Sequence, residues 1–117
     1  MKTLLIVEDE FSLSEALASV LSEEGYCVLL AGNGRQGLER AAERRPDLVL
    51  TDLMMPLMDG RAMIQALRAD PALEKLPIIL MSAVDGRLAL RDLPGIPFVR
   101  KPFDLDTLLA LISAALQ

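Results

Sequence analysis

Five polar residues of this chain stand at the ends of apolar, strand-like blocks and have the side chains needed to handle a phosphoryl group. Glu8 and Asp9 follow the first block, and Asp52 ends the third. Ser82 and Lys101 follow the fourth and fifth blocks. The carboxyl ends of parallel strands meet at one edge of a sheet, where open α/β folds bind their ligands. We therefore expect these side chains to lie close together.

The chemistry of such a cluster is set by its charges. Carboxylates repel one another by roughly 4 kcal/mol per pair at about 4 Å, for an effective dielectric constant of about 20, and a single lysine cannot balance three of them. Oxygen ligands of this kind suit Mg²⁺. A phosphoryl group on Asp52 would be neutralised by the metal and by Lys101, with a hydrogen bond from Ser82. An aspartate nucleophile forms an acyl phosphate, so the cluster predicts a phosphorylation site.

Each of these residues also has a purely structural explanation. Asp52 could cap the segment that follows it, and Asp9 or Ser12 could cap the first helix. Ser82, with Asp85 three residues later, fits a capping box at the start of a helix. Lys101 could be a solvated loop lysine. Their joint placement at successive strand ends favours a shared functional site over four separate structural roles.

The elements that must position these side chains alternate along the chain. Apolar blocks predict strands, which we place at residues 3–7, 26–30, 47–52, 77–81 and 98–100. Amphipathic patterns predict helices at residues 11–24, 35–45, 61–69, 85–92 and 104–116. Strands alternating with helices through short connections predict an α/β fold with a parallel sheet and right-handed crossovers.

Composition limits the class of protein. The length of 117 residues predicts a single domain covering 1–117, and a hydrophobic content of 52% is enough for an ordinary folded core. The net charge of -5 argues against nucleic-acid binding by this domain. No apolar run is long enough for a membrane span, and acids follow the start too soon for a signal peptide, so we expect a cytoplasmic protein.

Five motifs together make the chain resemble a response-regulator receiver domain, the CheY-like module of two-component signalling. They are L-L-I-V-E-D-E at 4–10, A-G-N-G at 31–34, D-L-V-L-T-D-L-M-M-P-L-M-D-G at 47–60, P-I-I-L-M-S-A at 77–83 and K-P-F at 101–103. The resemblance covers essentially the whole chain. It implies a flavodoxin-like, doubly wound (βα)5 fold whose five parallel strands have the order 2-1-3-4-5.

The resemblance also implies a role for each residue of the predicted metal site. Asp52 falls at the phosphoacceptor position. Asp9 and Asp52 would bind Mg²⁺ together with the backbone carbonyl of Met54, and Glu8 would act on the metal through water. The family takes its phosphoryl group from a phosphohistidine of a sensor histidine kinase or histidine phosphotransfer protein. It is not an enzyme, apart from catalysing its own phosphotransfer and autodephosphorylation.

The remaining positions that the resemblance identifies belong to the switch. Ser82 falls at the hydroxyl switch position and Phe98 at the aromatic switch position, while Lys101 would contact the phosphoryl group. Phe98 has no hydroxyl, so its two states would differ by packing alone. The spacing from Ser82 to Lys101 is shorter than expected for the family, and Pro-Gly-Ile-Pro occupies 94–97. We therefore expect a short or displaced fourth helix.

The last helix has more apolar surface than a core stripe needs. Three residues extend that surface: Leu111, Ala114 and Ala115. One interpretation is a well-buried terminal helix. The other is a homodimer or partner interface formed by the fourth helix, fifth strand and fifth helix, with three arginines nearby: Arg87, Arg91 and Arg100.

Three classes of function are compatible with this sequence. The first is a phosphoaccepting receiver, and the second is a docking module of the same fold that works without phosphorylation. The third is an aspartate-nucleophile phosphohydrolase or a flavin carrier. Such a hydrolase usually has an acid two residues after its nucleophile, where this chain has Met54. A flavin carrier should have hydroxyls and glycines where Glu8 and Asp9 stand, so the third class ranks last.

Overall fold

The computed structural model describes residues 1–85 and 87–117, and these form a five-stranded sheet with four α-helices. The strands are β1 Thr3–Val7, β2 Cys27–Ala31, β3 Leu48–Asp52, β4 Ile78–Ser82 and β5 Phe98–Arg100. The helices are α1 Phe11–Glu23, α2 Gly34–Glu43, α3 Gly60–Ala69 and α4 Leu105–Ala115.

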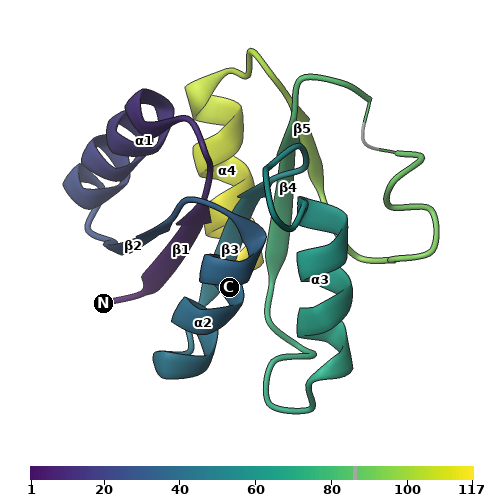
Figure 1. The fold of residues 1–117 in the computed structure, drawn as a ribbon. Coiled ribbons are helices and arrows are strands. Elements are labelled where there is room, and N and C mark those ends of the chain that lie inside the picture. The colour runs from purple at the N-terminus through teal and green to yellow at the C-terminus, as the bar shows by residue number, and fades with distance from the viewer. Residues whose placement is uncertain (86) are drawn as a thin grey trace.

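All the strands are parallel, and their order is β2-β1-β3-β4-β5 (Figure 1). This confirms the predicted strand order. The register aligns the carboxyl ends of the central strands, because Val7 lies beside Thr51 and Asp52 beside Met81. The order reverses between β1 and β3, and such a switch point leaves a crevice for ligands at the edge of the sheet.

Residues of β1 alternate between the two faces of the sheet. Leu5 and Val7 belong to the core that α2 and α3 cover, whereas Leu4 and Ile6 belong to the core under α1 and α4. All four side chains are completely buried. Both faces of the sheet are therefore apolar, which explains why its central strands consist of nearly continuous hydrophobic residues.

Side-chain caps start three of the helices. Asn33 accepts a hydrogen bond from Gln36 N at 2.9 Å, and Asp59 accepts one from Ala62 N at 2.8 Å. Asp104 caps α4 in the same way. Helix α1 has no side-chain cap, since Glu10 occupies its N-cap position without such a bond. Asp9 is therefore not a helix cap.

The helix predicted at 85–92 is wrong for the residues described in that range. Residues 87–92 form turns, with hydrogen bonds from Leu90 N to Arg87 O and from Leu93 N to Leu90 O. The side chain of Asp85 accepts a bond from Arg87 N at 3.0 Å, which gives the backbone an alternative to a helix. Position 86 lies outside the described residues. We call residues 87–97 the turn segment.

The turn segment replaces the predicted helix as a cover for the sheet. It places four partly buried apolar side chains against the core shared by α2 and α3: Ala89, Leu90, Leu93 and Ile96. The sequence led us to expect a short or displaced fourth helix, but the described residues 87–92 form turns instead of an α-helix. The interface predicted from a fourth helix would have to use turns instead.

Helix α4 buries part of its apolar surface. Leu108 and Ile112 are completely buried, and Leu111 and Ala115 pack partly against the same core, while Ala114 is exposed. A shallow groove runs along this end of the helix, lined by Pro77, Ile78, Gly95, Pro97, Leu111, Ala114 and Ala115. Among the described helices, none is long and apolar enough to cross a bilayer.

Candidate functional site

Three carboxylates meet at the carboxyl edge of the sheet. Glu8 and Asp9 directly follow β1, and Asp52 is the last residue of β3, the neighbouring strand. One oxygen from each of the three side chains lies within 4.8 Å of the others. Glu8 and Asp52 are buried and Asp9 is exposed, so the cluster has a protected side and an open side.

Lys101 bridges two of these acids. Its Nζ donates a hydrogen bond to Glu8 Oε1 at 2.7 Å and lies 3.3 Å from Asp52 Oδ2. The backbone N of Lys101 donates to Ser82 O at 2.7 Å, which extends the pairing of β4 with β5 by one residue. The Lys101–Pro102 peptide bond is cis. The two contacts of Nζ with the acids show that the lysine faces the cluster and is not a solvated loop residue.

The protonation of Glu8 and Lys101 is set by burial and by their pairing. Burial raises the pKa of Glu8, and the hydrogen bond from Lys101 offsets this only in part. For Lys101, burial acts to lower the pKa, but the hydrogen bond to Glu8 and the charge of Asp52 outweigh it, so the pKa is raised. Three carboxylates facing one ammonium leave the site with an excess of negative charge.

The backbone around Asp52 is held by its neighbours. Asp52 Oδ1 accepts a hydrogen bond from Leu53 N at 2.9 Å, and Thr51 Oγ1 donates to Asp52 O at 2.9 Å. Thr51 is completely buried, so this bond is shielded from water. Asp52 is only 6% exposed and does not cap a helix, because α3 begins later with Asp59 as its cap.

Gly60 lets helix α3 start directly against the strand end that carries Asp52. A Cβ atom at this position would lie 2.2 Å from Asp52 O and 3.0 Å from the Cα of Leu53. Gly60 N donates to Leu53 O at 2.8 Å. The sequence analysis missed this role of Gly60, and it missed the bond made by Thr51. The only signal in the sequence was a glycine after Asp59 at the start of a helical pattern.

The two residues assigned to the switch lie on neighbouring strands. Ser82 ends β4, is completely buried, and accepts a hydrogen bond from Val84 N through its Oγ at 3.1 Å. This bond replaces the capping box considered for Ser82 and Asp85. Phe98 begins β5 and packs, partly buried, against the core covered by α2 and α3. Met54, in the loop after β3, is 66% exposed.

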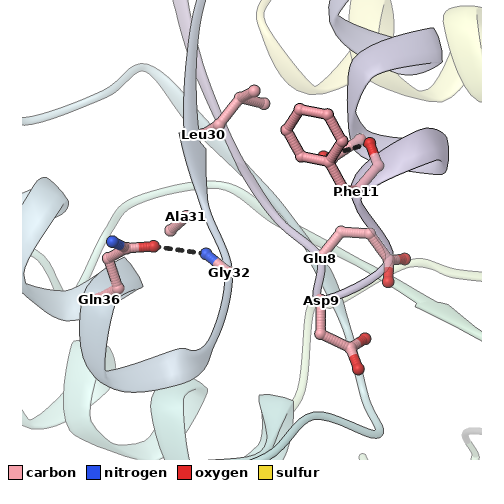
Figure 2. Close-up of a pocket in the computed structure, with 8 residues that line it drawn as sticks. Glu8, Asp9, Phe11, Leu30, Ala31, Gly32 and Gln36 are labelled. Carbon is pink, nitrogen blue, oxygen red and sulfur yellow. Dashed lines mark hydrogen bonds between the residues drawn. The ribbon is translucent and has the colours of Figure 1, made fainter.

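A pocket beside the carboxylates opens between α1 and the end of β2. Figure 2 shows Glu8 and Asp9 along one side of it, with the ring of Phe11 reaching toward Leu30. The opposite wall is fixed by Gly32 N, which donates to the side chain of Gln36 at 2.6 Å. Phe11 is 68% exposed, so an apolar side chain stands next to the acids on the open side of the cluster.

The donor set fits a hard divalent cation. All three clustered side chains offer carboxylate oxygens, and hard cations such as Mg²⁺ and Ca²⁺ prefer oxygen ligands. The single ammonium of Lys101 leaves negative charge uncompensated, which favours a cation at this edge. The arrangement can therefore bind a metal ion next to the carboxylate of Asp52.

Comparison with known proteins identifies the class to which this fold and site belong. The family model described as the response regulator receiver domain matches residues 4–113. The chain therefore belongs to the response regulator receiver domain family. Receiver domains are signalling modules of two-component systems that work with sensor histidine kinases, and they are not classical enzymes.

Individual relatives of this chain are also response regulators. The chain is 39% identical over 118 residues to the DNA-binding response regulator MtrA of Mycobacterium tuberculosis, and 38% identical over 117 residues to the response regulator MprA of Mycobacterium leprae. Each match covers 97% of this chain and 50% of the relative. The chain thus spans about half the length of these curated relatives.

Solved structures give the same result. The signal receiver domain of a signal transduction histidine kinase from Syntrophus aciditrophicus matches with a TM-score of 0.90 and 34% identity, over 99% of this chain and 90% of the other. The chemotaxis response regulator CheY4 of Vibrio cholerae matches with a TM-score of 0.90 and 26% identity, over 98% of both chains. These neighbours support the receiver fold.

Proposed function

We propose that this chain is a phosphoaccepting receiver domain in which Asp52 takes a phosphoryl group from a phosphohistidine. The donor would be a sensor histidine kinase or a histidine phosphotransfer protein, and the reaction would take place in the cytoplasm. The observation that carries the proposal is the position of Lys101 Nζ between Glu8 and Asp52, within the cluster of three acids. A buried carboxylate beside an ammonium and a metal-binding cluster is suited to accept a phosphoryl group.

Magnesium is the cation that we propose for this site. Asp9 and Asp52 would hold it with the backbone carbonyl of Met54, and Glu8 would contact it through water. Mg²⁺ commonly keeps several waters and uses one or two carboxylates together with phosphate oxygens, which matches this limited set of protein ligands. When bound, it would supply the positive charge that offsets the phosphoryl oxygens.

The residues of the chain would divide the transfer between them. A carboxylate oxygen of Asp52 forms a bond to phosphorus while the bond from phosphorus to the imidazole nitrogen breaks, and the electron pair of that bond returns to the ring. The ammonium of Lys101 stabilises negative charge on the transferred group. The bond from Leu53 N to Asp52 Oδ1 orients the carboxylate for attack.

Phosphorylation would then change the surroundings of Ser82. The hydroxyl of Ser82 accepts a bond from Val84 N in this structure and also has a proton to donate. A phosphoryl group on Asp52 offers strong acceptor oxygens, toward which that proton can turn. Phe98 lies on the neighbouring strand, and its packing would change when Ser82 moves. The two residues together would act as the switch that controls a partner or output.

Intact-mass measurement tests the proposed function. We expect the wild-type protein to gain one phosphoryl group from a small-molecule phosphodonor such as acetyl phosphate when Mg²⁺ is present. Removing Mg²⁺ with a chelator should prevent the gain, because the excess negative charge of the site would repel the donor. The Asp52→Asn variant should remain unlabelled under all conditions. Equal labelling of wild type and Asp52→Asn would contradict the proposal.

Mg²⁺ binding should be visible as increased thermal stability. At a Mg²⁺ concentration about 100 times its Kd, linkage predicts about 2.7 kcal/mol of stabilisation, which corresponds to a rise in Tm of roughly 10 °C for a domain of this size. Differential scanning calorimetry of wild type and Asp9→Asn, each with Mg²⁺ or with EDTA, measures it. Asp9→Asn should lose most of the rise and be no less stable than wild type in EDTA, because one like charge is gone.

Glu10→Gln is the matched control for that experiment. Glu10 is the next acid along the chain, is exposed, and does not belong to the cluster; its carboxylate accepts a bond from Ser12 Oγ. Its backbone N, which the substitution keeps, donates to Glu8 Oε2 at 3.0 Å. This variant should keep the full effect of Mg²⁺. A Mg²⁺ response that Glu10→Gln loses and Asp9→Asn retains would place the metal elsewhere.

A second function, docking without phosphorylation, is favoured by one observation. The turn segment stands where the sequence predicted a helix, so the surface next to the switch differs from the expected one. A wild-type protein that binds Mg²⁺ but takes up no phosphoryl group would support this alternative. A homodimer through β5 and α4 stays a prediction, and light scattering with and without the phosphodonor would test it.

A further inference from the structure

Arg61 ties the first turn of α3 to the turn segment. Its Nη1 and Nη2 donate to Asp92 Oδ1 and Oδ2 at 2.8 Å each, and Nη1 also donates to the carbonyl oxygen of Ala89. The two parallel bonds to a carboxylate are the bidentate pairing that the planar guanidinium favours. We call these three residues the Arg61 clasp.

The clasp is joined to the phosphoacceptor by one rigid contact. Arg61 directly follows Gly60, whose backbone lies against Asp52 O without room for a Cβ and donates a hydrogen bond to Leu53 O. Asp59 fixes the same turn of the helix by capping Ala62 N. The turn of helix that carries Arg61 is therefore anchored to the backbone next to Asp52.

The turn segment is thus connected to the site at two points. Before the segment, Val84 N donates to the hydroxyl of Ser82, and within the segment the clasp holds Ala89 and Asp92. In Figure 1 the turn segment runs beside α3, on the side of the sheet that this helix covers. Val84, before the segment, is therefore held by Ser82, and the middle of the segment is held by α3.

We propose that the Arg61 clasp is a conformational restraint, which holds the turn segment in its unphosphorylated position and opposes the switch. The inference rests on the proposed function. When the side chain of Ser82 rotates to bring its hydroxyl to a phosphoryl group on Asp52, Oγ itself moves, and the bond from Val84 N must shift with it or break. Val84 would then move, while Arg61 keeps Ala89 and Asp92 against α3. The clasp therefore resists the movement.

Thermodynamic linkage gives the direction of the effect. A contact made in one state and weakened in the other lowers the affinity of any ligand that favours the second state. Hydrogen bonds from Arg61 lower the pKa of Asp92, so its carboxylate is charged at neutral pH. The side chains of Arg61 and Asp92 are 32% and 57% exposed, so the pair can open without unfolding the protein.

Binding of beryllofluoride, a phosphoryl mimic, in the presence of Mg²⁺ tests the proposal. We expect Arg61→Gln and Asp92→Asn each to bind the mimic about fivefold more tightly than wild type, the low end of typical coupling between sites. Amide hydrogen exchange of residues 87–97 in the metal-free protein should become severalfold faster in both variants. Isothermal titration and exchange followed by mass spectrometry provide the two readouts.

Arg87→Gln is the matched control. Arg87 lies in the same segment and also pairs with an aspartate, but its partner is Asp85, two residues away, and neither residue belongs to the clasp. This variant should bind the mimic with wild-type affinity. Wild-type affinity in Arg61→Gln, or an equal gain in Arg87→Gln, would overturn the inference. Failure of the wild type itself to bind the mimic would instead overturn the proposed function, and the inference with it.

Discussion

Replacing Lys101 with methionine is expected to destabilise the metal-free protein by about 3 kcal/mol. The ammonium of Lys101 is the hydrogen-bonded partner of Glu8, whose side chain is only 1% exposed, and it also lies beside Asp52. Removing one partner of a buried ion pair leaves an uncompensated charge, which typically costs roughly 3–5 kcal/mol. Urea unfolding of wild type and Lys101→Met in EDTA measures the difference.

Two comparisons separate this effect from a general loss of positive charge. Lys75→Met removes an exposed lysine and should change the free energy of unfolding by less than about 0.5 kcal/mol. Mg²⁺ should restore part of the stability of Lys101→Met, because a cation bound by the acids replaces some of the missing charge. Equal stability of Lys101→Met and Lys75→Met in EDTA would mean that Lys101 does not compensate Glu8.

Replacing Gly60 with alanine is expected to cost about 2 kcal/mol and to impair the site at the same time. The new Cβ would meet three backbone atoms, Asp52 O at 2.2 Å, the Cα of Leu53 at 3.0 Å and the carbonyl carbon of Asp52 at 3.1 Å, so the strand end or the helix must move. Overpacking of this kind usually costs roughly 1–3 kcal/mol, which exceeds the gain of about 0.5–1 kcal/mol from alanine in a helix. Thermal unfolding and Mg²⁺ titration measure both consequences.

Gly32→Ala is the control for the Gly60 variant. Its new Cβ would lie 3.6 Å from Gln36 Oε1, which is an ordinary contact with a flexible side chain. This substitution should change the free energy of unfolding by less than about 1 kcal/mol and leave Mg²⁺ affinity unchanged. If Gly60→Ala proved as stable as Gly32→Ala with full Mg²⁺ affinity, the close approach of α3 to Asp52 would be of no consequence.

The sheet could be predicted because its strands are buried on both faces. The blocks containing Leu4–Val7 and 48–51 are too short and too apolar for surface helices, and the polar residues that end them sit where parallel strands finish. Once β1 and β3 are neighbours, Glu8, Asp9 and Asp52 must come together. The acidic cluster therefore follows from topology, which the pattern of apolar residues predicts.

The turn segment could not be predicted because tertiary contacts decide its conformation. Its residues include leucine, alanine and arginine, which are good helix formers, so local propensity favoured a helix at 85–92. In the structure, Arg61 binds Ala89 and Asp92 from a helix about 30 residues away in sequence. A hydrogen bond between residues so far apart in the sequence leaves no periodic signal in it.

The partner of Lys101 was also beyond sequence analysis. The resemblance to receiver domains implied a contact with the phosphoryl group, and the strand order brings Lys101 to the correct edge of the sheet. Its hydrogen bond to Glu8 joins residues 93 positions apart, and it depends on which acid lies nearest in the metal-free protein. Only the side-chain geometry distinguishes Glu8 from Asp9 as that partner.

The central claim is that Asp52 itself carries the phosphoryl group. Borohydride reduces an acyl phosphate of aspartate to homoserine, so reduction after treatment with a phosphodonor and Mg²⁺ marks the modified residue permanently. Peptide mapping by mass spectrometry should find homoserine at position 52 and aspartate at positions 9 and 59. Homoserine at another aspartate, or at none in a protein that has bound Mg²⁺, would contradict the claim.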